Sequence, residues 1–171
     1  MANTMTLIAS STVGSGGAAS IDFTSIPSTY TDIVFMLSAR STVAQNGASL
    51  YMRFNGGTTT NTIRNLYGNG TAAASQNSAD AWSGVDANGA NTTANVFANT
   101  QIYFPNYAGS TNKSWSAESV VENNATLGYD EMAAGLWANT AAINRVTFTI
   151  ENASGNFVQF STAYLYGIKN S

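Results

Sequence analysis

Apolar and polar residues alternate with a period of two along much of this chain, as they do in half-buried β-strands. In residues 49–54, Leu50, Met52 and Phe54 fall on one face. Residues 32–40 form the strongest apolar run, and their Val, Ile and Phe content is typical of a buried strand. Further strands are predicted over residues 7–9, 20–23, 101–104, 115–122, 131–137, 145–150 and 157–168.

Turn sequences separate these predicted strands. The dipeptide Asn-Gly begins at residues 46, 55, 69 and 88, and it tolerates the positive φ angles of type I′ hairpin turns. About nine or ten strands around one core favour a sandwich. We therefore predict an all-β fold, a jelly-roll-like antiparallel β-sandwich. Residues 1–20 are assigned to an N-terminal segment, a candidate docking arm, and residues 21–171 to a single sandwich domain.

Residues 71–99 depart from the strand pattern. They are rich in Ala, Asn, Ser, Thr and Gly, and their large apolar side chains are Trp82, Val85, Val96 and Phe97. A structureless stretch of this length is uncommon in a compact domain and is usually functional or docked on a partner. We predict a long surface loop with one short strand near Phe97. The alternative is an arm that packs on a neighbouring subunit.

The composition excludes several classes of function. The 171 residues include no His and no Cys, so Ser-His-Asp and Cys-His catalysis, Cys/His zinc sites and disulfides are impossible. Six Lys and Arg residues are a poor electrostatic footprint for nucleic acid. Charged residues make up only 9% of the chain, whereas Thr, Asn and Ser together number 60. Such a composition suits a hydrogen-bonded surface that packs on neighbours.

Carboxylates are the acid–base groups that remain. Asp130 and Glu131 are adjacent, so in a strand they point to opposite faces. Glu118 and Glu122 share a face but lie about 13 Å apart, more than the ~5–9.5 Å of paired glycosidase carboxylates. A pair drawn from different strands is left open. We predict a non-enzymatic protein with no catalytic residues, no cofactor and no metal.

The aromatic segment at the end of the strand predicted over residues 101–104 has two interpretations. It is either a corner of the core or, if exposed, a contact patch for a protein or a sugar, because Tyr and Trp give large contact areas at little entropic cost. With the N-terminal segment and the loop around Trp82, this corner supplies the candidate interface residues: Thr4, Thr6, Leu7, Ile8, Trp82, Tyr103, Phe104, Pro105 and Tyr107.

The N-terminus lacks the basic segment and long apolar run of a secretory signal. No apolar run approaches the ~18 residues of a membrane span. We therefore expect synthesis in a cytoplasm and no membrane partner.

Six segments of the chain are familiar in combination: residues 21–32, 65–70, 105–114, 122–126, 134–143 and 155–168. Together they resemble a family of small virion structural proteins of tailed bacteriophages, many of them aquatic. The resemblance extends from about residue 6 to residue 168 and is weakest over residues 71–99. The family contributes no catalytic residues, and its members are taken either as head-decoration proteins or as tail-fibre components.

The resemblance implies a virion protein made in the host cytoplasm. Our first hypothesis is a capsid decoration (cement) protein, which binds the major capsid protein as a homotrimer and stabilises the assembled head by mass action. Residues 1–20 are the candidate clamp. The alternative is a tail-fibre or receptor-binding module in which Trp82 and Tyr107 contact host glycan. Neither hypothesis involves nucleic acid or a membrane.

Overall fold

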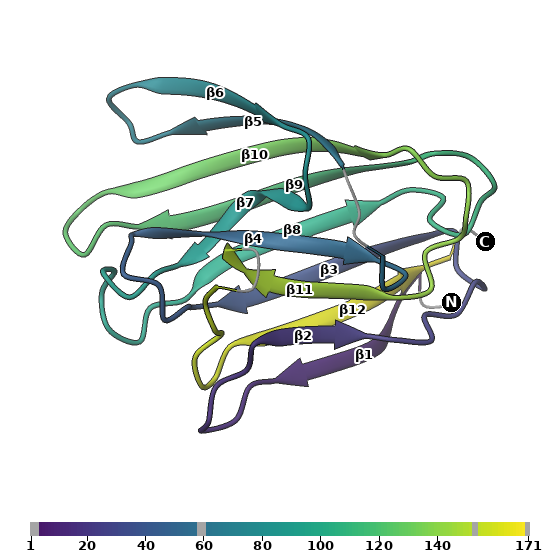
Figure 1. Cartoon of the computed structure of the whole chain (residues 1–171), viewed down its shortest axis with the longest axis horizontal. Helices are drawn as coiled ribbons and strands as arrows, with labels where there is room; N and C mark the ends of the chain where they lie inside the picture. The colour runs from purple at the N-terminus through teal and green to yellow at the C-terminus, as the bar shows by residue number, and fades with distance from the viewer. Residues whose placement is uncertain (1–3, 58–60, 152–153, 170–171) are drawn as a thin grey trace.

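The computed structural model describes residues 4–57, 61–151 and 154–169, and these form two antiparallel β-sheets packed face to face (Figure 1). The all-β sandwich predicted from the alternation is confirmed. The larger sheet has eight strands in the order β1 (Met5–Thr12), β12 (Thr162–Ile168), β3 (Asp32–Ala39), β8 (Ala98–Phe104), β9 (Lys113–Glu122), β10 (Gly128–Trp137), β5 (Thr62–Gly68) and β6 (Ala73–Ser78).

The smaller sheet has four strands and covers only part of the larger one. Its order is β2 (Ser20–Phe23), β11 (Val146–Ile150), β4 (Gly47–Phe54) and β7 (Trp82–Asn88). In Figure 1, β5 and β6 extend beyond these four strands at the top of the view. Nowhere in the described residues is there a helix with the length and hydropathy of a membrane span.

Aromatic side chains fill the interlayer space beneath β2, β11 and β4. Phe35 on β3 packs edge-on against Phe148 on β11, with ring centroids 5.2 Å apart. Phe54 on β4 lies 5.6 Å from Phe104 on β8 and 5.8 Å from Trp115 on β9. Edge-to-face pairs of this kind add about 0.5–1.5 kcal/mol each beyond the area that they bury. The inward positions of the alternating strands therefore form one aromatic core.

The segment predicted as a loop, residues 71–99, is instead mostly strand. It contains β6, β7 and the start of β8, with β7 packed over β9 and β10. The prediction failed at β7 partly because this strand approaches the larger sheet so closely at Gly84 that a larger residue has no room there. A Cβ on Gly84 would lie 2.4 Å from the Cβ of Ala133 and 2.9 Å from a methyl carbon of Ile63, and Gly84 also has a φ of 90°.

The outer edge of β7 is hydrogen-bonded by side chains of the larger sheet rather than by another strand. An edge strand buried without partners would leave backbone groups unsatisfied, at a cost of about 1–3 kcal/mol each. Four bonds prevent this: Trp115 Nε1 to Ser83 O (3.3 Å), Asn65 Nδ2 to Gly84 O (2.6 Å), Ser119 Oγ to Asp86 O (2.8 Å) and Asp86 N to Glu131 Oε2 (2.7 Å). We call these four contacts the β7 clasp.

Candidate functional site

The aromatic corner after β8 belongs to the core, so its interpretation as a contact patch is wrong for two of its residues. Phe104 and Tyr107 are fully buried. Phe104 packs edge-on against Phe35 at 6.1 Å, and the Tyr107 hydroxyl donates to the carbonyl of Pro27. Burial raises the pKa of Tyr107 above its usual value. Pro105 alone of these three is exposed.

Tyr103 and Trp82 are also held by internal contacts. The half-buried Tyr103 donates its hydroxyl to Asp32 Oδ2 at 2.7 Å, and this bond raises the pKa of Tyr103. Asp32 Oδ1 accepts the backbone N–H of Asn106 at 2.8 Å, so one carboxylate fixes the corner. Trp82 is only 9% exposed and donates Nε1–H to the carbonyl of Val85 at 3.2 Å. Its ring faces do not lie open to a partner.

The N-terminal segment contains a strand of the larger sheet, β1. Within residues 1–20, β1 pairs with β12, and the Thr4 carbonyl accepts a hydrogen bond from Lys169 N at 3.1 Å. Thr4, Thr6 and Leu7 are exposed and Ile8 is half-buried. Residues 1–3 lie outside the described residues. Of the candidate interface residues, Leu7 is the large apolar one that is left exposed, at 51%.

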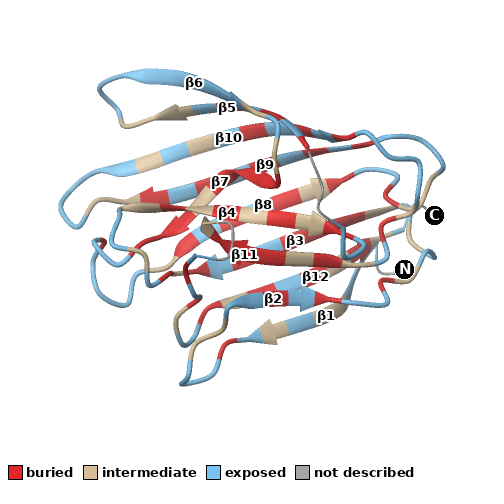
Figure 2. Ribbon diagram, in the orientation of Figure 1, coloured by how far each residue is buried: buried red, intermediate tan, exposed pale blue. Residues whose placement is uncertain are grey.

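The broadest candidate surface is the outer face of the larger sheet, the face turned away from the smaller sheet. Leu7, Met36 and Tyr164 lie on it toward one end, and Leu66, Met132, Leu136 and Val120 toward the other. Leu66 is 61% exposed and Met132 57%. Figure 2 shows exposed positions alternating with buried ones along these strands. Exposed apolar side chains gathered on one face are typical of a protein contact surface.

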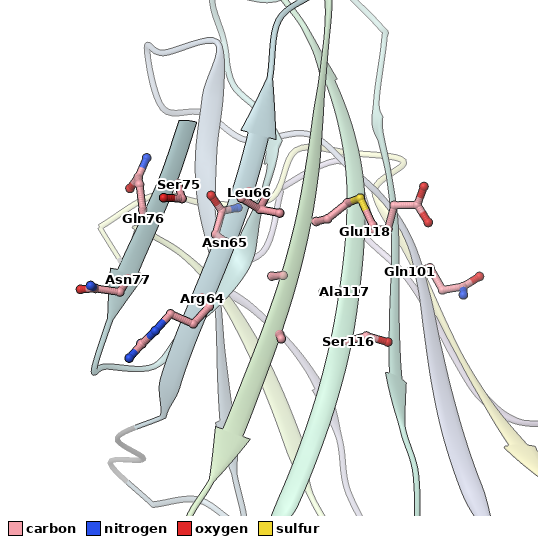
Figure 3. A pocket seen from close by; sticks show the side chains of 13 residues that line it. Arg64, Asn65, Leu66, Ser75, Gln76, Asn77, Gln101, Ser116, Ala117 and Glu118 are labelled. Carbon is pink, nitrogen blue, oxygen red and sulfur yellow. The ribbon is translucent and has the colours of Figure 1, made fainter. Parts of the chain in front are cut away.

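A groove of about 560 Å³ crosses this outer face over β6, β5, β10 and β9. The strand register places one row across it: Ser75, Leu66, Met132, Glu118 and Gln101. Figure 3 shows Ser75, Leu66, Glu118 and Gln101 following one another across the strands. Arg64 and Asn77 line the groove as well. The groove therefore has an apolar floor and neutral polar side chains around it. It also carries two opposite charges, those of Arg64 and Glu118.

A second arrangement lies on the inner side, where Asp86 of β7 meets Glu131 of β10. These two acids line a smaller cavity of about 240 Å³, together with Tyr67, Tyr129 and Gln76 among others. Burial raises the pKa of Asp86 to about 6. Burial, and next the charge of Asp86, raise the pKa of Glu131 to about 8. The sequence left open a pair of acids from different strands, and the packing of the two sheets supplies this one.

The β7 clasp accounts for the position of both acids. Glu131 accepts the Asp86 backbone N–H, while Asp86 Oδ1 is buried without a partner among the described atoms. A Cβ on Gly47 would lie 2.3 Å from Asp86 Oδ2, so a larger residue there would displace the carboxylate from this position. The described residues hold no group of three or more Asp, Glu, His or Cys placed to bind a metal ion.

Neither the outer-face groove nor the acid pair was identified from the sequence. Alternation assigns one face of each strand to the core, but it does not show that Leu66 and Met132 are neighbours on the opposite face. Asp86 and Glu131 are 45 residues apart in the chain, and only the packing of β7 against the larger sheet brings them together. No protein-family model matches the chain, and the comparisons with curated proteins and with solved structures found no match.

Proposed function

We propose that this chain is a virion structural protein of a tailed bacteriophage that coats the assembled head as a decoration protein. The observation that carries the proposal is the outer face of the larger sheet, which presents large exposed apolar side chains such as Leu7, Leu66 and Met132. Interface centres are depleted in charged residues and enriched in aromatic residues and Met. The resemblance of the chain to small virion structural proteins, some of which are taken as head-decoration proteins, is the reason for proposing a virion surface as the partner.

Stabilisation of the head would follow from mass action. A protein that binds the assembled shell but not its free subunits shifts the equilibrium toward the shell. Repetition of a modest contact by the symmetry of the shell raises the overall binding strength without any new contact within one copy. The major capsid protein is the proposed partner, and a homotrimer is the proposed state on the shell.

The outer face, rather than an N-terminal arm, is the docking surface in this proposal. Residues 5–12 form β1, so this part of the N-terminal segment contributes through the same face, with Leu7 beside Tyr166 in the ladder. The tail-fibre alternative depended on Trp82 and Tyr107 as sugar-contacting rings. Both are buried, which removes that alternative's stated contacts.

A cryo-EM map of the intact particle tests the role directly. Density for this chain repeated over the shell would support decoration. Density only at the tail would refute it and make binding to the host surface the question to pursue.

A binding assay tests the surface. Purified heads that lack the protein are mixed with the full chain, and bound protein is measured by co-sedimentation. The double variant Leu66→Ser, Met132→Ser should bind at least about tenfold more weakly, because it removes two apolar side chains from the centre of the contact. Phe160→Ser is the matched control, since Phe160 is 65% exposed but lies in the loop before β12. Equal loss in both variants, or in neither, would contradict docking through this face.

A further inference from the structure

Three of the four sheet edges carry a feature that prevents pairing with another chain. β1 has a register shift between Leu7 and Ala9, a bulge that disrupts the ladder. β2 is four residues long, and its Asp22 forms an ion pair with Arg145 at 2.6 Å. The edge of β7 is covered by the β7 clasp. β6, at the remaining edge, has β5 as its one strand neighbour.

β6 lacks these protective features. Its sequence, Ala-Ala-Ser-Gln-Asn-Ser, contains no charge and no Pro, and it pairs with β5 in unbroken register. Five of its six residues are exposed, so both faces of the strand are open (Figure 2). Natural proteins usually protect an edge with charge, Pro or a bulge, because an unprotected edge is a template for another strand. This edge is therefore ready to accept a partner.

The ladder shows which backbone groups of β6 face outward. Asn69 N donates to Ala72 O across the turn between β5 and β6, so this pair is hydrogen-bonded. Hydrogen-bonded and non-bonded pairs alternate along an antiparallel ladder. The N–H and C=O groups of Ala73, Ser75 and Asn77 therefore point away from β5, toward the edge.

We propose that β6 is a strand-pairing interface for a second copy of this chain. The two β6 strands lie antiparallel about a two-fold axis, with Ser75 opposite Ser75 of the second copy and Ala73 opposite Asn77 of the second copy. In this register all three outward-facing residues exchange hydrogen bonds, and the two larger sheets become one continuous sheet. The contact is two-fold, so it is distinct from the trimer proposed above, and it does not depend on the virion role.

A second copy suits this edge better than an unrelated strand because β6 is complementary to itself. Cross-strand pairs of like charge are destabilising, and the proposed register places no charge opposite another. Each pair joins residues whose side chains are on the same face, as antiparallel pairing requires. The formal net charge of each copy is only −3, so repulsion between copies is weak.

Charge reversal at Ser75 tests the proposal with the full chain. In Ser75→Lys the two lysines are opposite each other, and in Ser75→Glu the two glutamates are. Each variant alone should dissociate at least about tenfold more readily than the parent, measured by sedimentation velocity over a concentration series. An equimolar mixture of the two variants should restore the two-fold complex. Ser114→Lys, an exposed serine on the central strand β9, is the matched control and should behave as the parent.

Amide hydrogen exchange distinguishes loss of the interface from loss of the fold. The Ser75 amide should be protected in the parent and exchange rapidly in Ser75→Lys, whereas the Gln76 amide, which faces β5, should stay protected in both. A parent that shows no self-association, an unchanged mass in both variants, or a mixture that fails to recover the complex would overturn the proposal.

Discussion

The two halves of the interlayer space are built in different ways. Beneath β2, β11 and β4 the sheets are held apart by interlocking aromatic rings such as Phe35, Phe104 and Phe148. Beneath β7 they approach closely, with Gly84 against Ala133, and are joined by hydrogen bonds to a strand edge. The first half depends on buried volume. The second depends on a close approach of the backbone at Gly84 and on satisfied polar groups.

The difference predicts how each half responds to substitution. An aromatic core loses stability when atoms are removed, because a cavity is left behind. A closely approached strand loses stability when atoms are added, because rigid backbone must shift to accommodate them. Measurements of the free energy of unfolding in denaturant can therefore test the two halves with changes of opposite kind.

Truncation at the centre of the aromatic half should have the largest effect. Phe35 is fully buried and contacts three other phenylalanine rings. Phe35→Ala should lower the free energy of unfolding by about 3–5 kcal/mol. Phe160→Ala is the control, because Phe160 is 65% exposed, and it should change that free energy by less than about 0.5 kcal/mol. A loss below about 1 kcal/mol at Phe35 would contradict the assigned core.

Addition of one methyl group to the β7 half should have the next largest effect. Gly84→Ala should cost about 2–4 kcal/mol, because the new Cβ meets Ala133 and an L-residue at positive φ is strained. Gly14→Ala adds the same atom where nothing lies within 4 Å, so that variant should keep the stability of the parent. Equal unfolding midpoints for the two variants would show that β7 does not approach β10 so closely.

These two halves also explain how much of the fold the sequence could predict. Strands that carry Phe35 and Phe54 alternate large apolar residues with other side chains, and their ranges were predicted to within a few residues. β7 carries Ser83, Gly84 and Ala87 at buried positions because the space there is narrow. Small residues contribute little to a hydrophobic pattern, so this strand was taken for a loop.

The candidate sites were harder to predict, because they depend on which strands become neighbours. Ser119 and Glu131 appear in the sequence as ordinary polar positions, and only the packing of β7 gives them backbone groups to bond. Leu66 and Met132 are 66 residues apart and become neighbours through the pairing of β5 with β10. Single-strand patterns contain no information on that pairing.

The dependence of stability on pH should report on the β7 half alone. The pKa values of Asp86 and Glu131 in the fold, about 6 and about 8, lie above their ordinary values of 3.8 and 4.5. The folded state therefore binds more protons than the unfolded state between about pH 4 and pH 8. The stability from this pair is fully present below the ordinary pKa values and is lost as the pH rises through this window.

Asp22 works in the opposite sense but in a different range. Burial acts to raise its pKa, yet hydrogen bonds from Arg145 and Thr147 outweigh burial and lower that pKa below 3.8. Its contribution is lost only in more acidic solution.

Thermal unfolding between pH 5 and pH 8.5 tests the acid pair, and the midpoint should fall in the parent and show a flatter profile in Glu131→Gln. Glu118→Gln, an exposed acid on β9, should retain the parent's slope. A midpoint that rises across this window would refute the assignment.

Removal of one clasp hydroxyl should have the smallest effect, and strand β9 offers an internal comparison. Ser119 is buried, donates to the Asp86 carbonyl at 2.8 Å and lies 2.9 Å from the Thr100 hydroxyl. Ser119→Ala should cost about 1 kcal/mol, because the carbonyl of Asp86 and the hydroxyl of Thr100 each lose a partner. Ser116→Ala makes the same change on the outer face of the same strand and should leave the free energy of unfolding unchanged. Both substitutions remove a serine hydroxyl from the same strand. A difference between their effects on the free energy of unfolding therefore isolates the contribution of the hydrogen bond to the β7 edge. Equal effects would mean that β7 is held by close packing alone.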